Sequence, residues 1–346
     1  MKNNKLYFPK PRSKSLIFTI LALILSFVHF PLFSFDNSWD AITDTKRKGE
    51  KKEEVKEKVK DDEKVKEKEE EKEIEEEDAD ELRRKNRGQV ASKDRQKGLY
   101  TLTRYYNKKT LEHSYYFTNE GYDYLSFTLT LSLEQMKADP SAKVHVIIPP
   151  LAKDIYLVTA KAIDPYKSHR FGAKAEMMAG NPNAVHNGTY APPFEKGKEY
   201  YLSNAFMGNL SHKGKYAVDF NMPKGSMICA AREGVVVRMK NDGNKGGPSP
   251  KFNDDGNYVS ILHSDGTYGN YAHFRQWGIL VKVGDKIKEG QNIGYSGNTG
   301  YSTGPHLHFD VTKANGKGGF TTLPFQFRKL DGSLLDPEVG LTLTNN

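Results

Sequence analysis

The sequence predicts an all-β protein: a C-terminal antiparallel β-sandwich or barrel at 196–346, preceded by a small β-sandwich-like domain at 98–165. In DYLSFTLTLSL apolar residues alternate with polar ones, which is typical of a half-buried strand. From Lys196 onward, short apolar runs are bounded by Gly, Asp, Asn or Pro, as in sandwiches and barrels. No segment there has helical periodicity.

The N-terminus, residues 1–36, predicts a signal peptide or a membrane anchor. A basic stretch ends with Lys10, Arg12 and Lys14, and SLIFTILALILSFVHFPLFSF follows. That apolar run is about as long as the ~20 residues that span a bilayer, so residues 16–35 could tether the chain to a membrane. Because Pro31 interrupts it and no A-x-A pattern follows, cleavage stays open. We expect an exported protein, in the periplasm or cell envelope.

The composition of residues 37–97 predicts a linker rich in Lys and Glu. The apolar residues in KKEEVKEKVKDDEKVKEKEEEKEIEEE are too sparse for a heptad seam. A solvated single helix and a disordered tether are both compatible with this composition. In either form the segment is a spacer.

Two further regions separate the linker from the C-terminal domain. The small β domain at 98–165 shows no catalytic constellation, and a prodomain, a spacer and a binding module all remain open. Residues 166–195 are rich in Gly, Pro, Asn and Ala, which predicts a connecting loop region.

The net charge and the cysteine count indicate which partners and which covalent cross-links the chain can have. The chain carries a net charge of +8, and 18 basic and 13 acidic residues give the segment 196–346 a net charge of +5. A mildly basic domain suits an anionic polymer or a membrane surface. The chain has no recognisable nucleic-acid-binding motif, so we expect no nucleic-acid partner. The single cysteine, Cys229, excludes an intrachain disulfide and is interpreted as a small buried strand residue.

The stretch GYSTGPHLHFDV contains two histidines that could take part in metal binding or catalysis. Side chains alternate faces along a strand, so His306 and His308 point the same way. Leu307 and Phe309 then point toward the core. Two imidazoles on one face can share a metal ion, or one can bind it while the other handles protons.

A second stretch, SHKGKYAVDF, contributes His212 and Asp219. Taken alone, Asp219 would be interpreted as a surface residue. With His308 the three would give two nitrogens, one oxygen and an open fourth position, which is the composition of a catalytic zinc site. A water bound there has a pKa of ~7, and further histidines could serve as acid or base groups.

Three ordered motifs, SHKGKYAVDF, GNYVSILHSDGTYGNYAHF and GYSTGPHLHFDV, resemble those of the lysostaphin-type zinc endopeptidases over roughly residues 190–315. These enzymes cut peptides of bacterial peptidoglycan. The resemblance implies the hybrid fold called the duplicated hybrid motif. It also implies one Zn²⁺ per chain, held by His212, Asp219 and His308.

By the same resemblance, His273 and His306 match the catalytic histidines, and His263 matches a non-essential one. Six residues separate His212 from Asp219, more than in the best-known members. Some relatives carry an inhibitory asparagine as a fourth ligand, and Asn204 and Asn209 lie near His212 in the sequence.

The sequence therefore predicts an exported zinc metalloendopeptidase that hydrolyses peptide bonds of peptidoglycan. The alternative is a catalytically silent module of the same fold that binds peptidoglycan or activates another cell-wall hydrolase. A structural surface protein, whose histidines merely line strands, is the third hypothesis.

Overall fold

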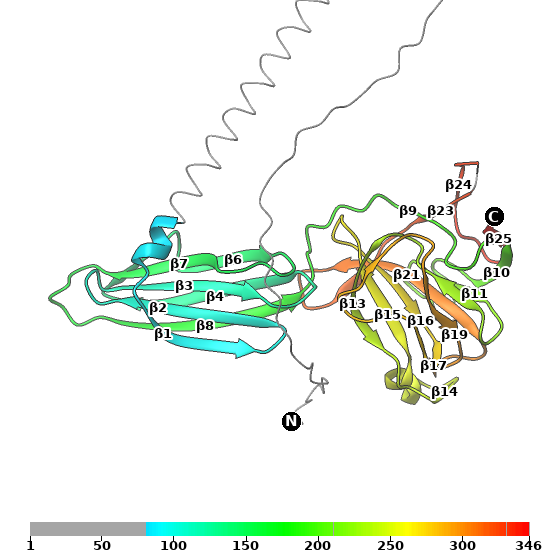
Figure 1. The fold of residues 1–346 in the computed structure, drawn as a ribbon, viewed down its shortest axis with the longest axis horizontal. Helices are drawn as coiled ribbons and strands as arrows, with labels where there is room; N and C mark the ends of the chain where they lie inside the picture. The colour runs from blue at the N-terminus through cyan, green and yellow to red at the C-terminus, as the bar shows by residue number, and fades with distance from the viewer. Residues whose placement is uncertain (1–80, 210, 330, 346) are drawn as a thin grey trace, which may run out of the picture. The chain divides into compact units, whose positions relative to one another are not determined.

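The computed structural model describes residues 81–209, 211–329 and 331–345, and it is almost entirely β structure (Figure 1). The described residues all lie within one compact unit, Glu71–Asn346. The predicted signal or anchor at 1–36 and most of the charged linker lie outside them. Among the residues described, none of the helices has the length and apolar character needed to cross a membrane.

Residues 81–86 are helical and lead into the first β region, which has two sheets. One sheet has the order β1 (Gln89–Gln96), β2 (Tyr100–Asn107), β3 (Glu112–Asn119), β7 (Ile155–Ala162) and β5 (Met136–Asp139); the other is β6 (Lys143–Ile148), β4 (Leu125–Glu134) and β8 (Arg170–Ala179). Both sheets contribute to one core, in which Phe127 and Leu129 of β4 lie with Phe117 and Val158. The alternation predicted for β4 is therefore confirmed.

The strands of this region extend past 98–165 at both ends. β8 lies in the segment interpreted as a connecting loop, and β1 lies within the predicted linker. β8 forms a strand because it pairs with β4 over ten residues, from Leu125↔Ala179 to Glu134↔Arg170. Its Gly and Ala residues give no apolar alternation, so the sequence alone does not indicate a strand here. All residues of β1 are exposed, so it shows no apolar alternation.

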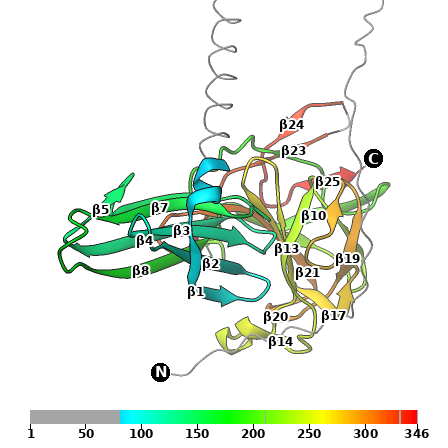
Figure 2. The same ribbon diagram turned by 60° about the vertical axis from the view of Figure 1, so that its left-hand side comes forward.

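The second β region is built on a nine-stranded sheet that curls around its core (Figure 2). Its order is β18 (Lys286–Ile287), β13 (Gly234–Lys240), β15 (Tyr258–Leu262), β16 (Tyr268–Ala272), β21 (His306–Ala314), β11 (Ala217–Asn221), β10 (Lys198–Asn204) and β25 (Thr342–Asn345), and β22 (Phe320–Thr322) also pairs with β21. The pairings within this sheet are antiparallel, as the sequence predicts.

Smaller sheets and one 3₁₀ helix complete this region. They are β12 (Met227–Cys229), β19 (Asn292–Ser296) and β17 (Phe274–Ile279); β14 (Gly246–Gly247) and β20 (Gly300–Tyr301); β24 (Leu334–Leu335), β23 (Gln326–Arg328) and β9 (Thr189–Tyr190); and η1 (Pro250–Asp255). Cys229 is free and buried in β12, as the sequence analysis predicts.

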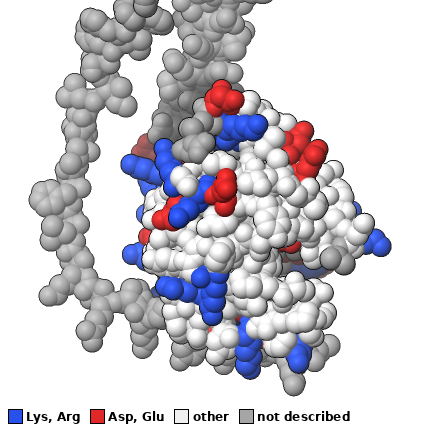
Figure 3. Space-filling model, turned by 90° about the vertical axis from the view of Figure 1, so that its right-hand side faces the viewer, with Lys and Arg blue, Asp and Glu red and all other residues white. Residues whose placement is uncertain are grey.

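Charge on this region is mixed. On the face drawn in Figure 3, Lys and Arg side chains lie in separate groups among uncharged residues, with acidic side chains between some of them. The modest positive charge counted from the sequence is therefore not gathered into one continuous patch on this face.

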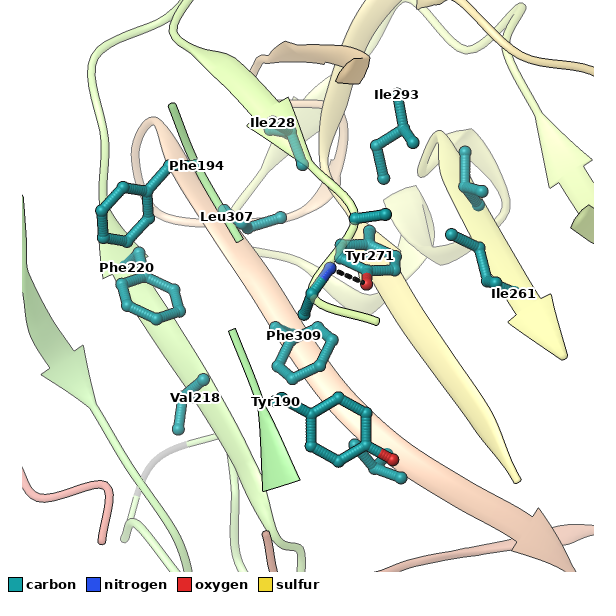
Figure 4. Close-up of a cluster of buried hydrophobic side chains, with 14 of the residues drawn as sticks. Tyr190, Phe194, Val218, Phe220, Ile228, Ile261, Tyr271, Ile293, Leu307 and Phe309 are labelled. Carbon is teal, nitrogen blue, oxygen red and sulfur yellow. Dashed lines mark hydrogen bonds between the residues drawn. The ribbon is translucent and has the colours of Figure 1, made fainter. Parts of the chain in front are cut away.

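The core of the second region is apolar and aromatic (Figure 4). Val218 and Phe220 of β11 pack with Leu307 and Phe309 of β21, and all four are fully buried. Full burial of such a side chain stabilises a fold by about 1.5–3 kcal/mol. Tyr271 of β16 is also fully buried, and its hydroxyl accepts a 2.7 Å hydrogen bond from the backbone N–H of Ala231.

We expect Tyr271→Phe to lower the free energy of unfolding by about 1–3 kcal/mol, because it leaves the buried N–H of Ala231 without an acceptor. Denaturant unfolding of the wild type and the variant measures the difference. Tyr301→Phe is the matched control, since Tyr301 is 46% exposed. Equal losses in the two variants would contradict the assignment.

Candidate metal centre

Two neighbouring strands place a carboxylate directly opposite an imidazole. β11 and β21 are antiparallel, with the register Asp219↔His308 and Asn221↔His306. Directly paired residues project to the same face of a sheet, so Asp219 and His308 meet on one side. The core residues Val218 and Phe309 pair with each other on the opposite side.

His212 reaches this face from a turn rather than from a strand. The backbone N–H of Lys215 donates to the carbonyl of His212 at 2.9 Å, and the N–H of Met207 donates to the carbonyl of Lys215 at 2.8 Å. His212 is 1% exposed, and its Nδ1–H donates to the carbonyl of Ala205 at 3.1 Å. That bond occupies Nδ1, so Nε2, which faces Asp219, is the nitrogen available to bind a cation in place of a proton. The turn absorbs the long spacing between His212 and Asp219.

The three side chains fit a tetrahedral metal site. One ligand atom from each of His212, Asp219 and His308 lies within 4.8 Å of the others. His212 Nε2 lies 3.3 Å from His308 Nδ1 and 3.2 Å from Asp219 Oδ2, and His308 Nδ1 lies 2.9 Å from Asp219 Oδ1. Zinc–nitrogen bonds of 2.0–2.1 Å imply about 3.3 Å between tetrahedral ligand atoms. The observed separations are close to that value.

The electrostatics of the cluster favour positive charge. Burial alone would raise the pKa of Asp219, but hydrogen bonds from His212 and His308 hold it far below its usual range. Burial alone would lower the pKa of His308, but its hydrogen bonds to Asp219 and Asp310 raise it to about 10. The carboxylate is therefore ionised, and the site stabilises a proton or another cation beside it.

Two further imidazoles lie beside these three side chains. His306 Nε2 lies 3.6 Å from Asp219 Oδ1, and His306 Nδ1–H donates to the carbonyl of Gly304 at 2.8 Å. His273 Nδ1–H donates to the carbonyl of Thr299 at 2.7 Å, and the His273 ring lies 4.5 Å from that of His306 between centroids. His273 has a φ of 70°, a left-handed conformation uncommon outside glycine.

Both of these imidazoles are neutral and present a free nitrogen. Burial, together with the nearby His306 and His308, lowers the pKa of His273 to about 3. Burial also lowers the pKa of His306, although Asp219 opposes that shift. At neutral pH each ring is uncharged, and its backbone acceptor fixes the proton on Nδ1. The free Nε2 of either ring can accept a hydrogen bond from a water molecule, and His306, beside Asp219, is the candidate general base.

The structure thus brings together all five side chains proposed from the sequence: His212, Asp219, His273, His306 and His308. Asp219 is 8% exposed, so the surface interpretation of that residue taken alone was wrong. The sequence motif could not reveal its burial, which depends on β21 and the His212 turn. Sequence reasoning also missed Asp310, which lies two residues after His308 on the same face of β21.

Two asparagines, Asn204 and Asn209, lie near His212 in the sequence. Asn204 of β10 is paired with Asp219, and its Nδ2 donates to Asp219 Oδ2 at 3.2 Å and to Ser211 Oγ at 3.0 Å. In this orientation Asn204 presents a donor, so it supports the carboxylate instead of offering an oxygen ligand. Asn209 is exposed.

The histidine interpreted as non-essential, His263, is 2% exposed. Its Nδ1–H donates to the carbonyl of Glu233 at 2.6 Å, and its ring lies 5.7 Å from that of Tyr190 between centroids. Its Nε2 is buried without a hydrogen-bond partner among the described residues. The prediction that His263 is structural agrees with these contacts.

Part of this chain matches a known protein family. Residues 213–319 match Peptidase family M23, a range that begins one residue after His212. The chain is 39% identical over 140 residues to an uncharacterized metalloprotease of Buchnera aphidicola, covering 37% of this chain and 33% of that protein.

Two further relatives have named activities. The chain is 42% identical to Peptidoglycan DD-endopeptidase ShyA of Vibrio cholerae, over 27% of this chain and 19% of that protein. It is 32% identical to Glycyl-glycine endopeptidase ALE-1 of Staphylococcus capitis, in an alignment that covers 42% of this chain and 37% of that protein. The chain thus spans between about a fifth and two fifths of the length of these relatives.

Burial of His263 predicts a pH-dependent loss of stability. Burial lowers its pKa to about 4, below the ~6.5 expected in the unfolded chain. The unfolded state therefore binds more protons between these values. The contribution to stability is complete above pH 6.5 and falls as the pH drops toward 4. Between pH 7 and pH 5 the loss from this residue is about 2 kcal/mol.

The variant His263→Asn keeps an N–H donor for the carbonyl of Glu233 and removes the titrating nitrogen. Its free energy of unfolding should fall by about 2 kcal/mol less between pH 7 and pH 5 than that of the wild type. Denaturant unfolding at the two pH values measures this. Parallel losses in the two proteins would refute the role given to His263.

Proposed function

Residues 213–319 form a peptidase family M23 domain, and from this premise we propose that the protein is an exported zinc endopeptidase that hydrolyses peptide bonds of peptidoglycan. The observation that carries the proposal is the convergence of His212, Asp219 and His308, with His273 and His306 beside them. A site with all five side chains in place favours a hydrolase over a silent module.

The donor set suits zinc. Two imidazole nitrogens and one carboxylate oxygen are typical ligands of catalytic zinc, which keeps a fourth position for water or substrate. Bound zinc would supply Lewis acidity toward the scissile carbonyl and a water of lowered pKa. His212 would bind through Nε2 and His308 through Nδ1, the nitrogens that face Asp219.

The remaining imidazoles would move protons. The unprotonated Nε2 of His273 can accept a hydrogen bond from the attacking water and orient it, and that of His306 can take a proton from it. Once protonated, the same ring can donate to the developing oxyanion or to the leaving amide nitrogen. The backbone carbonyls of Gly304 and Thr299 hold the two rings in orientation throughout, because each accepts from Nδ1–H.

The substrate proposal rests on the relatives and on the sequence. ShyA is named for action on peptidoglycan. The apolar segment at 16–35 is preceded by basic residues, as in an export signal, which would bring the catalytic domain to the cell wall. We propose a periplasmic or envelope location, with 16–35 as a possible tether.

We expect Asp219→Ala and His306→Ala to abolish release of peptidoglycan fragments, for different reasons. Asp219→Ala removes a ligand and should lose most bound zinc. His306→Ala removes a proton acceptor and should retain zinc. Digestion of purified peptidoglycan by the full chain, with mass analysis of fragments and metal analysis of each protein, tests both expectations.

The matched control is His145→Ala, which removes an exposed imidazole from β6 and should leave fragment release and zinc content unchanged. Equal fragment release by the wild type and both site variants would overturn the proposal. A wild type that binds zinc but releases no fragments would favour the silent binding or activating module.

Removal of metal should also destabilise the protein. A cation that binds only the folded state stabilises it by about 2.7 kcal/mol at a free concentration of 100 times its Kd. We therefore expect chelation to lower Tm and added Zn²⁺ to restore it in the wild type. Asp219→Ala should show no such shift in thermal scans. A zinc-dependent shift of equal size in that variant would contradict the ligand assignment.

A further inference from the structure

The two nitrogens of His308 face different partners. Nδ1 lies 2.9 Å from Asp219 Oδ1 and 3.3 Å from His212 Nε2, so it points to the cluster that would hold the metal. Nε2 lies 3.4 Å from Asp310 Oδ2. An imidazole that binds metal through Nδ1 must carry its proton on Nε2, and that proton needs an acceptor. Asp310 supplies one.

Asp310 is itself held in place by a row of polar side chains across three strands. Asp310 of β21 is paired with Asn270 of β16, which is paired with Ser260 of β15. Asn270 Nδ2 donates to Asp310 Oδ1 at 2.7 Å and to Thr312 Oγ1 at 3.0 Å. Ser260 Oγ donates to Asn270 Oδ1 at 2.7 Å.

The direction of these bonds determines what Asp310 can do. Because Ser260 occupies the oxygen of the Asn270 amide, the amide presents its NH₂ group to Asp310. Asp310 thus accepts at Oδ1 from Asn270 and at Oδ2 from His308. Its side chain is only 16% exposed, so water competes little for these positions.

We propose that Asp310 is a positioning residue that fixes the tautomer and orientation of His308 and raises the affinity of the site for its metal ion, with Asn270 holding Asp310 in place. The inference rests on the metal site proposed above. A carboxylate behind a ligating imidazole makes the imidazole a better donor, and its loss typically lowers metal affinity 10–100-fold.

The two candidate histidine ligands differ in what their second nitrogen contacts. The Nδ1–H of His212 donates to the backbone carbonyl of Ala205, a neutral acceptor that no side-chain substitution removes directly. The second nitrogen of His308 instead faces an ionisable side chain. Asp310 also adds a negative charge next to the cation, whereas the carbonyl adds only a dipole.

The test is the affinity of the full chain for Zn²⁺, titrated against a chromophoric chelator. Asp310→Asn keeps the size of the side chain and removes its charge, and it should bind Zn²⁺ 10–100-fold more weakly than the wild type. Asn270→Ala should weaken binding in the same direction by a smaller factor, because Asp310 loses its donor at Oδ1.

The matched control is Asp265→Asn. The Asp265 side chain is 13% exposed, close to the 16% of Asp310, and it accepts from Arg232 at 2.6 Å instead of from a site residue. This variant should be destabilised yet bind Zn²⁺ as the wild type does. Thermal scans in excess chelator measure the folding of each metal-free protein separately from its affinity.

The outcomes separate this inference from the proposed function. A wild type that binds no Zn²⁺ overturns both. Tight binding by the wild type with affinity within two-fold in Asp310→Asn overturns only the role of Asp310, as does an equal loss in Asp265→Asn. If Asp310→Asn does not fold, Asn270→Ala decides alone, and wild-type affinity in that variant overturns the inference.

Discussion

The candidate site depends on the antiparallel register of β11 and β21. Pairing of Asp219 with His308 brings a carboxylate and an imidazole from residues 89 positions apart in the sequence to a hydrogen-bonded distance. A slip of β11 by one residue against β21 would turn Asp219 into the core and bring Val218 to the polar face. The register is therefore fixed by the same alternation that builds the core, and the chemistry follows from it.

The polar face is organised in successive cross-strand rows. The pairing Asp219↔His308 continues to Ala272 of β16, and the next row contains Asp310, Asn270 and Ser260. Each row is made of directly paired residues, so a side chain in one strand is oriented by its neighbours in the next. A substitution on this face therefore changes the orientation of side chains in its own row and in the adjacent row.

Much of this arrangement could be predicted from the sequence, because it follows from the period-two geometry of strands. The separation of His306 and His308 from Leu307 and Phe309 needs only local alternation. The resemblance to known motifs then grouped the five site residues. Both expectations concern short stretches in which each residue's face is determined by its immediate neighbours.

Other features depend on contacts between distant segments. β8 is a strand because of its ladder with β4, although its own residues show no apolar alternation and it lies in a segment rich in Gly, Pro, Asn and Ala. The burial of Asp219 requires β21 and the turn that carries His212. The bond from Asn270 to Asp310 requires the pairing of β16 with β21. None of these can be read from one stretch of residues, since each partner comes from another part of the chain.

Two of the three candidate metal donors lie on neighbouring strands of one sheet, whereas His212 lies on a turn held by backbone hydrogen bonds. Insertions or deletions between His212 and the start of β11 would leave the sheet intact while moving one donor relative to the other two. Related sequences can therefore evolve tighter or weaker metal retention through the length of this one turn, without rebuilding the scaffold.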